Sequence, residues 1–95
     1  MSATKPPVAK FRVGRIMTTP NALAQLTQDD ILHGLQRHQA GDWGDVDQHD
    51  RTANECALIE GTRLWSVYHS ADGLKFWIIT EADRSVTTVL LPEDY

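Results

Sequence analysis

Two carboxylates, one guanidinium and two hydroxyls lie within six residues, 80–85, between two apolar segments. These groups would suit cleavage of a phosphodiester. Glu81 would act as general base on a ribose hydroxyl, and Arg84 would hold the phosphate through paired N–H bonds. His38 or His69 would then protonate the leaving oxygen. One hypothesis is therefore a small ribonuclease.

The same turn also has a structural interpretation. Glu81 and Arg84 are close enough in sequence to neutralise each other in a salt bridge, with Asp83 hydrogen-bonding the turn backbone. Because no complete catalytic set is evident, we favour a non-enzymatic protein that binds a partner through this turn and the loop around Trp43. The predicted binding residues are Asp42, Trp43, Thr80, Glu81, Asp83, Arg84 and Ser85.

Trp43 lies in a Gly-Asp-Trp-Gly loop, residues 41–44. Its indole would be either an exposed stacking platform or an anchor in the core. The flanking glycines let the backbone pass close to other elements, and large aromatic rings dominate core packing. We therefore favour the anchor.

Four aspartates and a histidine gather between residues 42 and 50. An EF-hand register that starts at Asp45 fails, since Asp50 falls where glycine is required and Cys56 where the bidentate glutamate belongs. No CxxC pair and no HExxH motif is present to form a familiar zinc site. Capping of a helix by Asp47 explains the cluster, so we expect no metal and no cofactor.

The first half of the chain predicts a strand and helices. Alternating apolar residues from Phe11 to Ile16 indicate a short strand at a sheet edge. A Thr-Pro pair then predicts a brief helix over residues 21–26. Thr27 and Asp30 have the spacing of a capping box, for a helix that ends near residue 40. Asp47 should cap a third helix, over residues 48–60.

The third helix has a face of small residues, which comprises Ala53, Cys56, Ala57 and Glu60. We expect this face to lie close against a sheet. Cys56 should be a buried small hydrophobe rather than a nucleophile, because free cysteines usually lie in the core.

The second half predicts strands at 62–69, 74–80 and 86–91, joined by short turns. Asp72-Gly73 is a strong hairpin signal, and Pro92 should end the last strand. The predicted fold class is α+β: a short N-terminal strand, two to three helices, and a three-stranded antiparallel meander packed against the helices.

The 95 residues predict a flexible tail over 1–10 and a single domain over 11–95. A single cysteine favours a reducing compartment. No signal sequence and no segment long enough to cross a bilayer is evident, so we expect a cytoplasmic protein without membrane contact. The net charge is −4, yet the first four basic residues precede any acid. We expect a solvated basic arm; contact with nucleic acid is the alternative.

Two stretches of the chain resemble a family of small bacterial proteins. The first is GDWG at residues 41–44. The second is WIITEADRS at residues 77–85, followed by Thr87-Thr88 and Leu90-Leu91-Pro92. These are described as plasmid-related and travel with plasmids, prophages and integrated elements. The resemblance implies an accessory role in a mobile element, with a host or plasmid protein, or nucleic acid, as the partner.

The order of helices and strands is also similar to that of small RNA-cleaving toxins of the RelE and barnase type. Those proteins carry basic surfaces, whereas this chain is acidic beyond its first fifteen residues. We therefore place the interaction protein first and the ribonuclease second.

Overall fold

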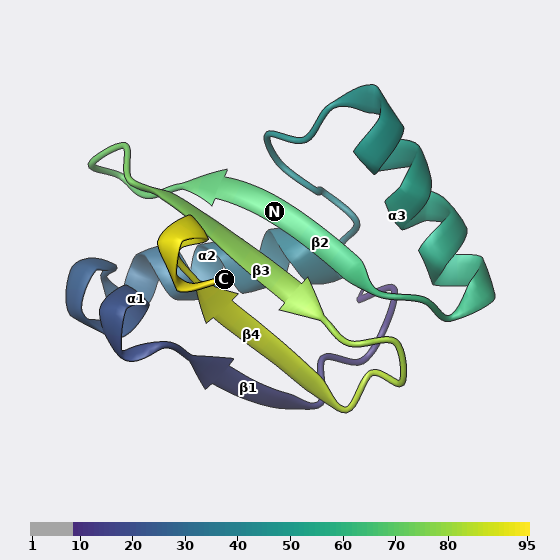
Figure 1. The fold of residues 1–95 in the computed structure, drawn as a ribbon, viewed down its shortest axis with the longest axis horizontal. Coiled ribbons are helices and arrows are strands. Elements are labelled where there is room, and N and C mark those ends of the chain that lie inside the picture. Colours follow the sequence, from purple (N-terminus) through teal and green to yellow (C-terminus); the bar gives the residue numbers. More distant parts are fainter. Residues whose placement is uncertain (1–8) are drawn as a thin grey trace, which may run out of the picture.

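The computed structural model describes residues 9–95, so the predicted flexible tail lies almost entirely outside the described residues. The chain has an α+β fold (Figure 1). Its elements are, in order, β1 (Arg15–Thr18), α1 (Pro20–Gln25), α2 (Gln28–Gln39), α3 (Gln48–Glu60), β2 (Leu64–His69), β3 (Lys75–Thr80), β4 (Val86–Leu90) and a final 3₁₀ turn, η1 (Pro92–Asp94). The predicted fold class is confirmed.

The four strands form one mixed sheet in the order β1-β4-β3-β2. β2, β3 and β4 are the predicted antiparallel meander. β1 joins this meander as an edge strand that runs parallel to β4, with Arg15 opposite Val86 and Thr18 opposite Val89. Its edge position agrees with the prediction, whereas its pairing with the last strand is a finding of the structure.

The first strand begins at Arg15, later than the predicted start at Phe11. Gly14 has a φ of +64°, which interrupts the extended chain just before the strand. Phe11 instead packs against the core, with its ring centroid 5.1 Å from that of His38 and 6.3 Å from that of Trp43. Phe11 therefore serves packing, and only the end of the predicted segment, from Arg15, pairs as a strand.

The predicted helix starts and stops are confirmed by their capping bonds. Thr27 and Asp30 form the reciprocal capping box of α2, at 3.0 and 3.1 Å. Asp47 accepts the N–H of Asp50 at 2.8 Å and caps α3. Gly61 ends α3 in the left-handed conformation.

α2 covers one face of the sheet, lying behind β3 in Figure 1. A Cβ on Gly34 would lie 3.0 Å from the side chains of Phe76 and Ile78, so glycine lets the helix approach the strands closely. We call this side the inner face; its strand residues are Leu64, Ser66, Tyr68, Phe76, Ile78, Thr80, Thr87 and Val89. The opposite, outer face carries Trp65, Trp77, Ile79, Thr88 and Leu90.

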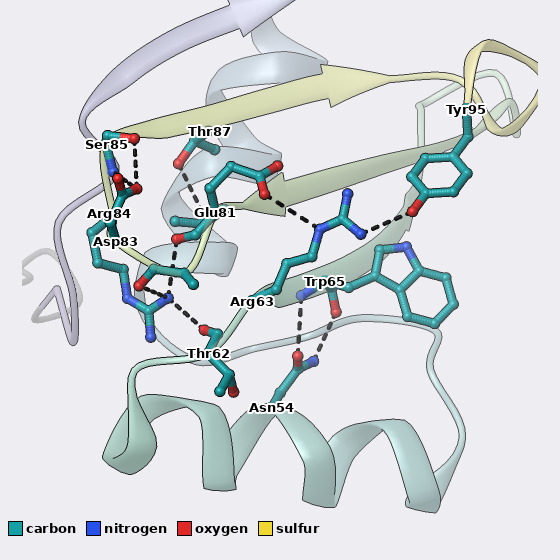
Figure 2. Close-up of polar contacts among 12 residues, drawn as sticks. Asn54, Thr62, Arg63, Trp65, Glu81, Asp83, Arg84, Ser85, Thr87 and Tyr95 are labelled. Carbon is teal, nitrogen blue, oxygen red and sulfur yellow. Dashed lines mark hydrogen bonds and ion pairs between the residues drawn. The ribbon is translucent and has the colours of Figure 1, made fainter.

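α3 lies beside β2, at the edge of the sheet, rather than flat on a face. The side chain of Asn54 donates to the carbonyl of Trp65 at 2.7 Å and accepts its N–H at 3.0 Å (Figure 2). Val67 has the next outward-facing main-chain groups on this edge. Its N–H donates to the carbonyl of Trp43, and its carbonyl accepts the N–H of Asp45. The edge of β2 is therefore closed by polar contacts.

These contacts explain why the predicted packing face of α3 is wrong. Asn54 and Ala57 are the buried residues of the helix, whereas Ala53, Cys56 and Glu60 are exposed. The helix turns its asparagine toward the strand because that side chain satisfies two main-chain groups of β2.

Within residues 9–95, no helix has both the length and the apolar composition needed to cross a membrane.

Candidate functional site

The turn between β3 and β4 is held by its own polar side chains. Asp83 Oδ1 accepts the backbone N–H of Ser85 at 3.0 Å and its hydroxyl at 2.6 Å. These two bonds hold the pKa of Asp83 below its ordinary value. The predicted hydrogen bonding of the turn backbone by Asp83 is confirmed. Arg84 has a φ of +62°, a left-handed conformation that is costly for a residue with a side chain.

The guanidinium of Arg84 ties this turn to the end of α3. It donates to the carbonyl of Ala57 at 2.9 Å and to that of Thr62 at 2.6 Å, the latter visible in Figure 2. Carbonyls at a helix C-terminus carry partial negative charge, so a cation is stabilised there. The expected pairing of Glu81 with Arg84 is replaced by a looser one, in which Glu81 Oε1 lies 3.7 Å from Nε of Arg63.

A buried chain of hydrogen bonds crosses the inner face. Ser66 Oγ lies 2.5 Å from Nδ1 of His38, and Nε2 of His38 lies 2.8 Å from the hydroxyl of Thr80. Thr80 bonds in turn to Thr87 at 2.7 Å, and Thr87 donates to the carbonyl of Val13 at 2.7 Å. This chain joins α2 to three strands and to the segment before β1.

The last acceptor in the chain fixes every proton in it. Because the carbonyl of Val13 can only accept, the hydroxyl of Thr87 donates its hydrogen to that carbonyl. Thr80 must therefore donate to the oxygen of Thr87. The oxygen of Thr80 then accepts from Nε2 of His38. Because burial lowers the pKa of His38 to about 3, the ring is neutral at pH 7, and Nδ1 accepts from Ser66. His38 is therefore the neutral tautomer with its hydrogen on Nε2.

His38 and Ser66 have the spacing of a base and a nucleophile, but both are completely buried. Burial lowers the pKa of His38 to about 3, and the nearby Arg84 adds a smaller effect in the same direction. At neutral pH this ring is not an imidazolium, so it cannot act as the general acid for a leaving group, and a substrate has no access to it. Its hydrogen bonds are structural.

His69 lies at the opposite end of the sheet from the 80–85 turn. It pairs with Lys75 at the start of β3, whereas Glu81 follows the last residue of that strand. Six residues of strand separate the two positions by roughly 20 Å. The structure therefore does not bring Glu81, Arg84 and a histidine together in one cleft.

Trp43 is an anchor, as favoured from the sequence. Its side chain is 1% exposed, and Nε1 donates to Glu55 at 2.8 Å. Asp42 beside it accepts two bonds from Arg37, which lower the pKa of this carboxyl. Of the other predicted binding residues, Thr80 is buried, Arg84 is partly buried, and Glu81, Asp83 and Ser85 are exposed.

A groove of about 320 Å³ lies on the outer face, lined by Arg63, Trp65, Trp77, Ile79 and Tyr95. The rings of Trp65 and Trp77 meet edge to face at 5.2 Å, and Trp77 meets Tyr95 at 5.6 Å. Arg63 donates to the hydroxyl of Tyr95 at 2.8 Å, and Figure 2 shows it between Glu81 and that ring. Strand side chains thus form the floor, and the C-terminal tyrosine forms one wall.

The groove contains an indole N–H without an acceptor. Nε1 of Trp65 is buried and has no hydrogen-bond partner among the described residues. A buried donor left unpaired costs about 1–3 kcal/mol, so an acceptor that reached it would be stabilising. The atom is covered in this structure, so a ligand oxygen can reach it only after a side chain of the groove moves aside.

A scan against protein-family models, a search of curated proteins and a search of solved structures each returned no match. The resemblance to plasmid-related proteins therefore stays a prediction. Function has to be inferred from the geometry of this chain alone.

Sequence reasoning passed over the groove, although part of the signal was present. The two-residue period of β2 puts Arg63 and Trp65 on one face, and the hairpin register puts Trp65 opposite Ile79. The return of Tyr95 over this face depends on η1, which has no comparable signal.

Within residues 9–95, no three His, Cys, Asp or Glu side chains are grouped in a way that could hold a metal ion.

Proposed function

We propose that this protein is a non-catalytic interaction module that binds a segment of a protein partner in the outer-face groove. The observation that carries the proposal is the groove built on Trp65 and Trp77, together with the indole N–H of Trp65, which has no acceptor among residues 9–95. Aromatic and arginine side chains in well-packed pockets dominate the binding energy of protein interfaces. The groove therefore suits one large apolar side chain of the partner.

The polar groups at the groove define what should flank that side chain. Trp65 Nε1 is a donor only, and the guanidinium of Arg63 offers further N–H groups. A carbonyl or carboxylate oxygen next to the apolar residue would satisfy both. Glu81, predicted as a binding residue, takes part at the rim through Arg63, whereas Trp43 supports the fold.

A protein partner fits this chain better than nucleic acid does. The sequence has thirteen acidic residues against nine basic ones, and phosphate contacts supply most of the affinity for nucleic acid. The resemblance to plasmid-related proteins implies that the partner belongs to the host or to the mobile element.

Selection from a phage-displayed library of linear peptides tests the proposal. Selected peptides should carry a bulky apolar residue next to an acidic one, and calorimetric titration should give measurable affinity for the wild type. Tyr95→Ala removes one wall of the groove at an exposed position and should weaken binding by about tenfold or more. Ile59→Ser changes another exposed apolar residue, on α3, and should bind as the wild type does.

Three results would contradict the proposal. The library could yield no binder, or the selected peptides could bind Tyr95→Ala as tightly as the wild type. Tight binding of a single-stranded oligonucleotide that depends on Tyr95 would instead assign the groove to nucleic acid.

A further inference from the structure

The outer edge of β1 has unpaired main-chain groups. Among the described residues β1 has a single neighbour in the sheet, β4. Arg15 donates its N–H to the carbonyl of Ser85, directly before β4, at 2.9 Å, and Thr19 donates to that of Val89 at 3.0 Å. In a parallel strand, the main-chain N–H and carbonyl of every second residue face the neighbouring strand. Those of residues 15, 17 and 19 are therefore directed toward β4. The N–H and carbonyl groups of Ile16 and Thr18 therefore point away from the sheet.

The two edges of the sheet differ in whether their outward main-chain groups have hydrogen-bond partners. At β2, Asn54 and residues 43–45 occupy the outward main-chain groups of Trp65 and Val67. At β1, no helix or strand of residues 9–95 lies along the outer side in Figure 1, and Ile16 and Met17 are each 47% exposed. An open edge with apolar side chains is a template for another strand.

We propose that β1 pairs with β1 of a second copy of this chain, antiparallel, about a twofold axis at Met17. In this register Ile16 lies opposite Thr18 of the second copy, and Thr18 lies opposite its Ile16. Each of these pairs exchanges two main-chain hydrogen bonds, so all four outward N–H groups and carbonyls on each side are used. The two Met17 side chains meet across the axis, and the sheets join into one of eight strands.

Charge complementarity selects a second copy as the occupant. The same register sets Arg15 opposite Thr19 of the second copy, whose hydroxyl donates to Asp94 at 2.6 Å. That bond is the main cause that lowers the pKa of Asp94, so the carboxyl is ionised at neutral pH. Arg15 is exposed and, among the described residues, makes no ion pair. Two Arg15–Asp94 pairs would form, one at each end of the joined strands.

The geometry of the C-terminal turn supports this pairing. Arg15 lies on the outer face because its partner in register is Val86 of β4. η1 packs on the same side, since Tyr95 directly after it meets the ring of Trp77. The cation and the carboxylate therefore approach each other from the same face of the extended sheet.

The interface is small, so we expect a dimer whose population depends on concentration. Analytical ultracentrifugation from low micromolar to millimolar concentration should show the mass rising from 10.7 kDa toward twice that value. Met17→Lys places like charges face to face and should give monomer throughout. Leu23→Lys introduces the same charge at another exposed apolar residue, outside the strand, and should dimerise as the wild type does.

Ile16→Pro gives a second, independent disruption. It removes an N–H that the intramolecular sheet does not use, so the fold should persist by circular dichroism while dimerisation is lost. Arg15→Glu should also weaken the dimer, whereas Arg12→Glu, an equal charge change at an exposed position before the strand, should leave it unchanged.

Amide hydrogen exchange of the wild type completes the test. Exchange of the Ile16 and Thr18 amides should slow as concentration rises, and that of other exposed amides should not. A wild type that stays monomeric at millimolar concentration would overturn the proposal. So would a dimer that survives in folded Met17→Lys and Ile16→Pro.

Discussion

The two faces of the sheet are built from alternate residues of the same strands, yet they use polar groups in opposite ways. On the inner face, His38 and three hydroxyls form a closed chain that ends on the carbonyl of Val13. On the outer face, Trp65 has a buried indole N–H for which the described part of the chain offers no acceptor. The inner face is complete within one chain, and the outer face is not.

This difference teaches where to look for function in a small domain. Histidine, serine and threonine together suggest catalysis, but here each one is hydrogen-bonded within the fold and hidden from solvent. The aromatic residues of the outer face suggest ordinary packing, but they line a groove with an unused donor. Catalytic residue types therefore mark the structural side of this molecule.

Removal of the inner imidazole should have the largest effect. His38→Ala leaves a cavity and strips Ser66 and Thr80 of their partner, so the free energy of unfolding should fall by about 3–5 kcal/mol. His33→Ala changes an exposed histidine of the same helix and should alter it by less than about 0.5 kcal/mol. Urea denaturation followed by circular dichroism measures both, and equal losses would show that the buried chain has no special role.

The pH dependence of stability comes next. His38 has a pKa of about 3 in the folded protein against 6.5 when exposed, so below pH 6.5 the unfolded state binds a proton that the folded state does not. Stability should therefore fall as pH decreases, by about 1.4 kcal/mol per unit between roughly pH 6 and 4. The carboxyls with lowered pKa begin to lose their contribution only below about pH 5, where the unfolded state starts to protonate them, so the slope between about pH 6 and 5 belongs to His38.

Comparison of variants isolates this effect. The pH slope should disappear in His38→Ala and persist in His33→Ala. The ¹⁵N resonances of His38 should also show a neutral ring protonated at Nε2 down to pH 4. A slope shared by both variants, or an imidazolium at pH 6, would refute the assignment of the buried network.

Removal of the Asn54 side chain from the β2 edge should lower the free energy of unfolding by an intermediate amount. Asn54→Ala leaves the N–H and carbonyl of Trp65 without partners, at a cost of about 1–3 kcal/mol in unfolding free energy. Ala53→Ser, at the exposed neighbouring position, serves as the control and should be nearly neutral. Thermal denaturation of the two variants decides whether asparagine is required at this edge.

The outer face should tolerate change with the smallest effect on stability. Tyr95 is 70% exposed, so Tyr95→Ala should alter the free energy of unfolding by less than about 0.5 kcal/mol. The same substitution is expected to reduce peptide binding, which separates function from folding on this face. A large loss of stability in guanidinium denaturation would show instead that the tyrosine closes the core.

Much of the fold could be predicted because its signals are local. Thr27, Asp47 and Gly61 mark helix ends through their own side chains or φ angles, and the Asp72-Gly73 turn marks the hairpin. The parallel partner of β1 could not be predicted, since it joins residues about seventy positions apart. Cys56 was assigned to the wrong face because a buried asparagine two positions earlier, not apolarity, orients α3.

The candidate site was harder to predict than the fold. Strand parity already places Ser66, Thr80 and Thr87 on the inner face, and Leu35 one turn before His38 puts the imidazole there too. Their closure into one chain depends on distances between elements, which no spacing in the sequence encodes. The groove likewise requires the C-terminal tyrosine to return over β3.

The indole resonances of the three tryptophans test the central claim most directly. In a ¹H–¹⁵N spectrum with a selected peptide, the Nε1–H signal of Trp65 should shift downfield as it gains an acceptor, and that of Trp77 should move with it. The signal of Trp43, buried and bonded to Glu55, should stay in place. Saturating peptide that leaves the Trp65 signal unchanged would contradict the account.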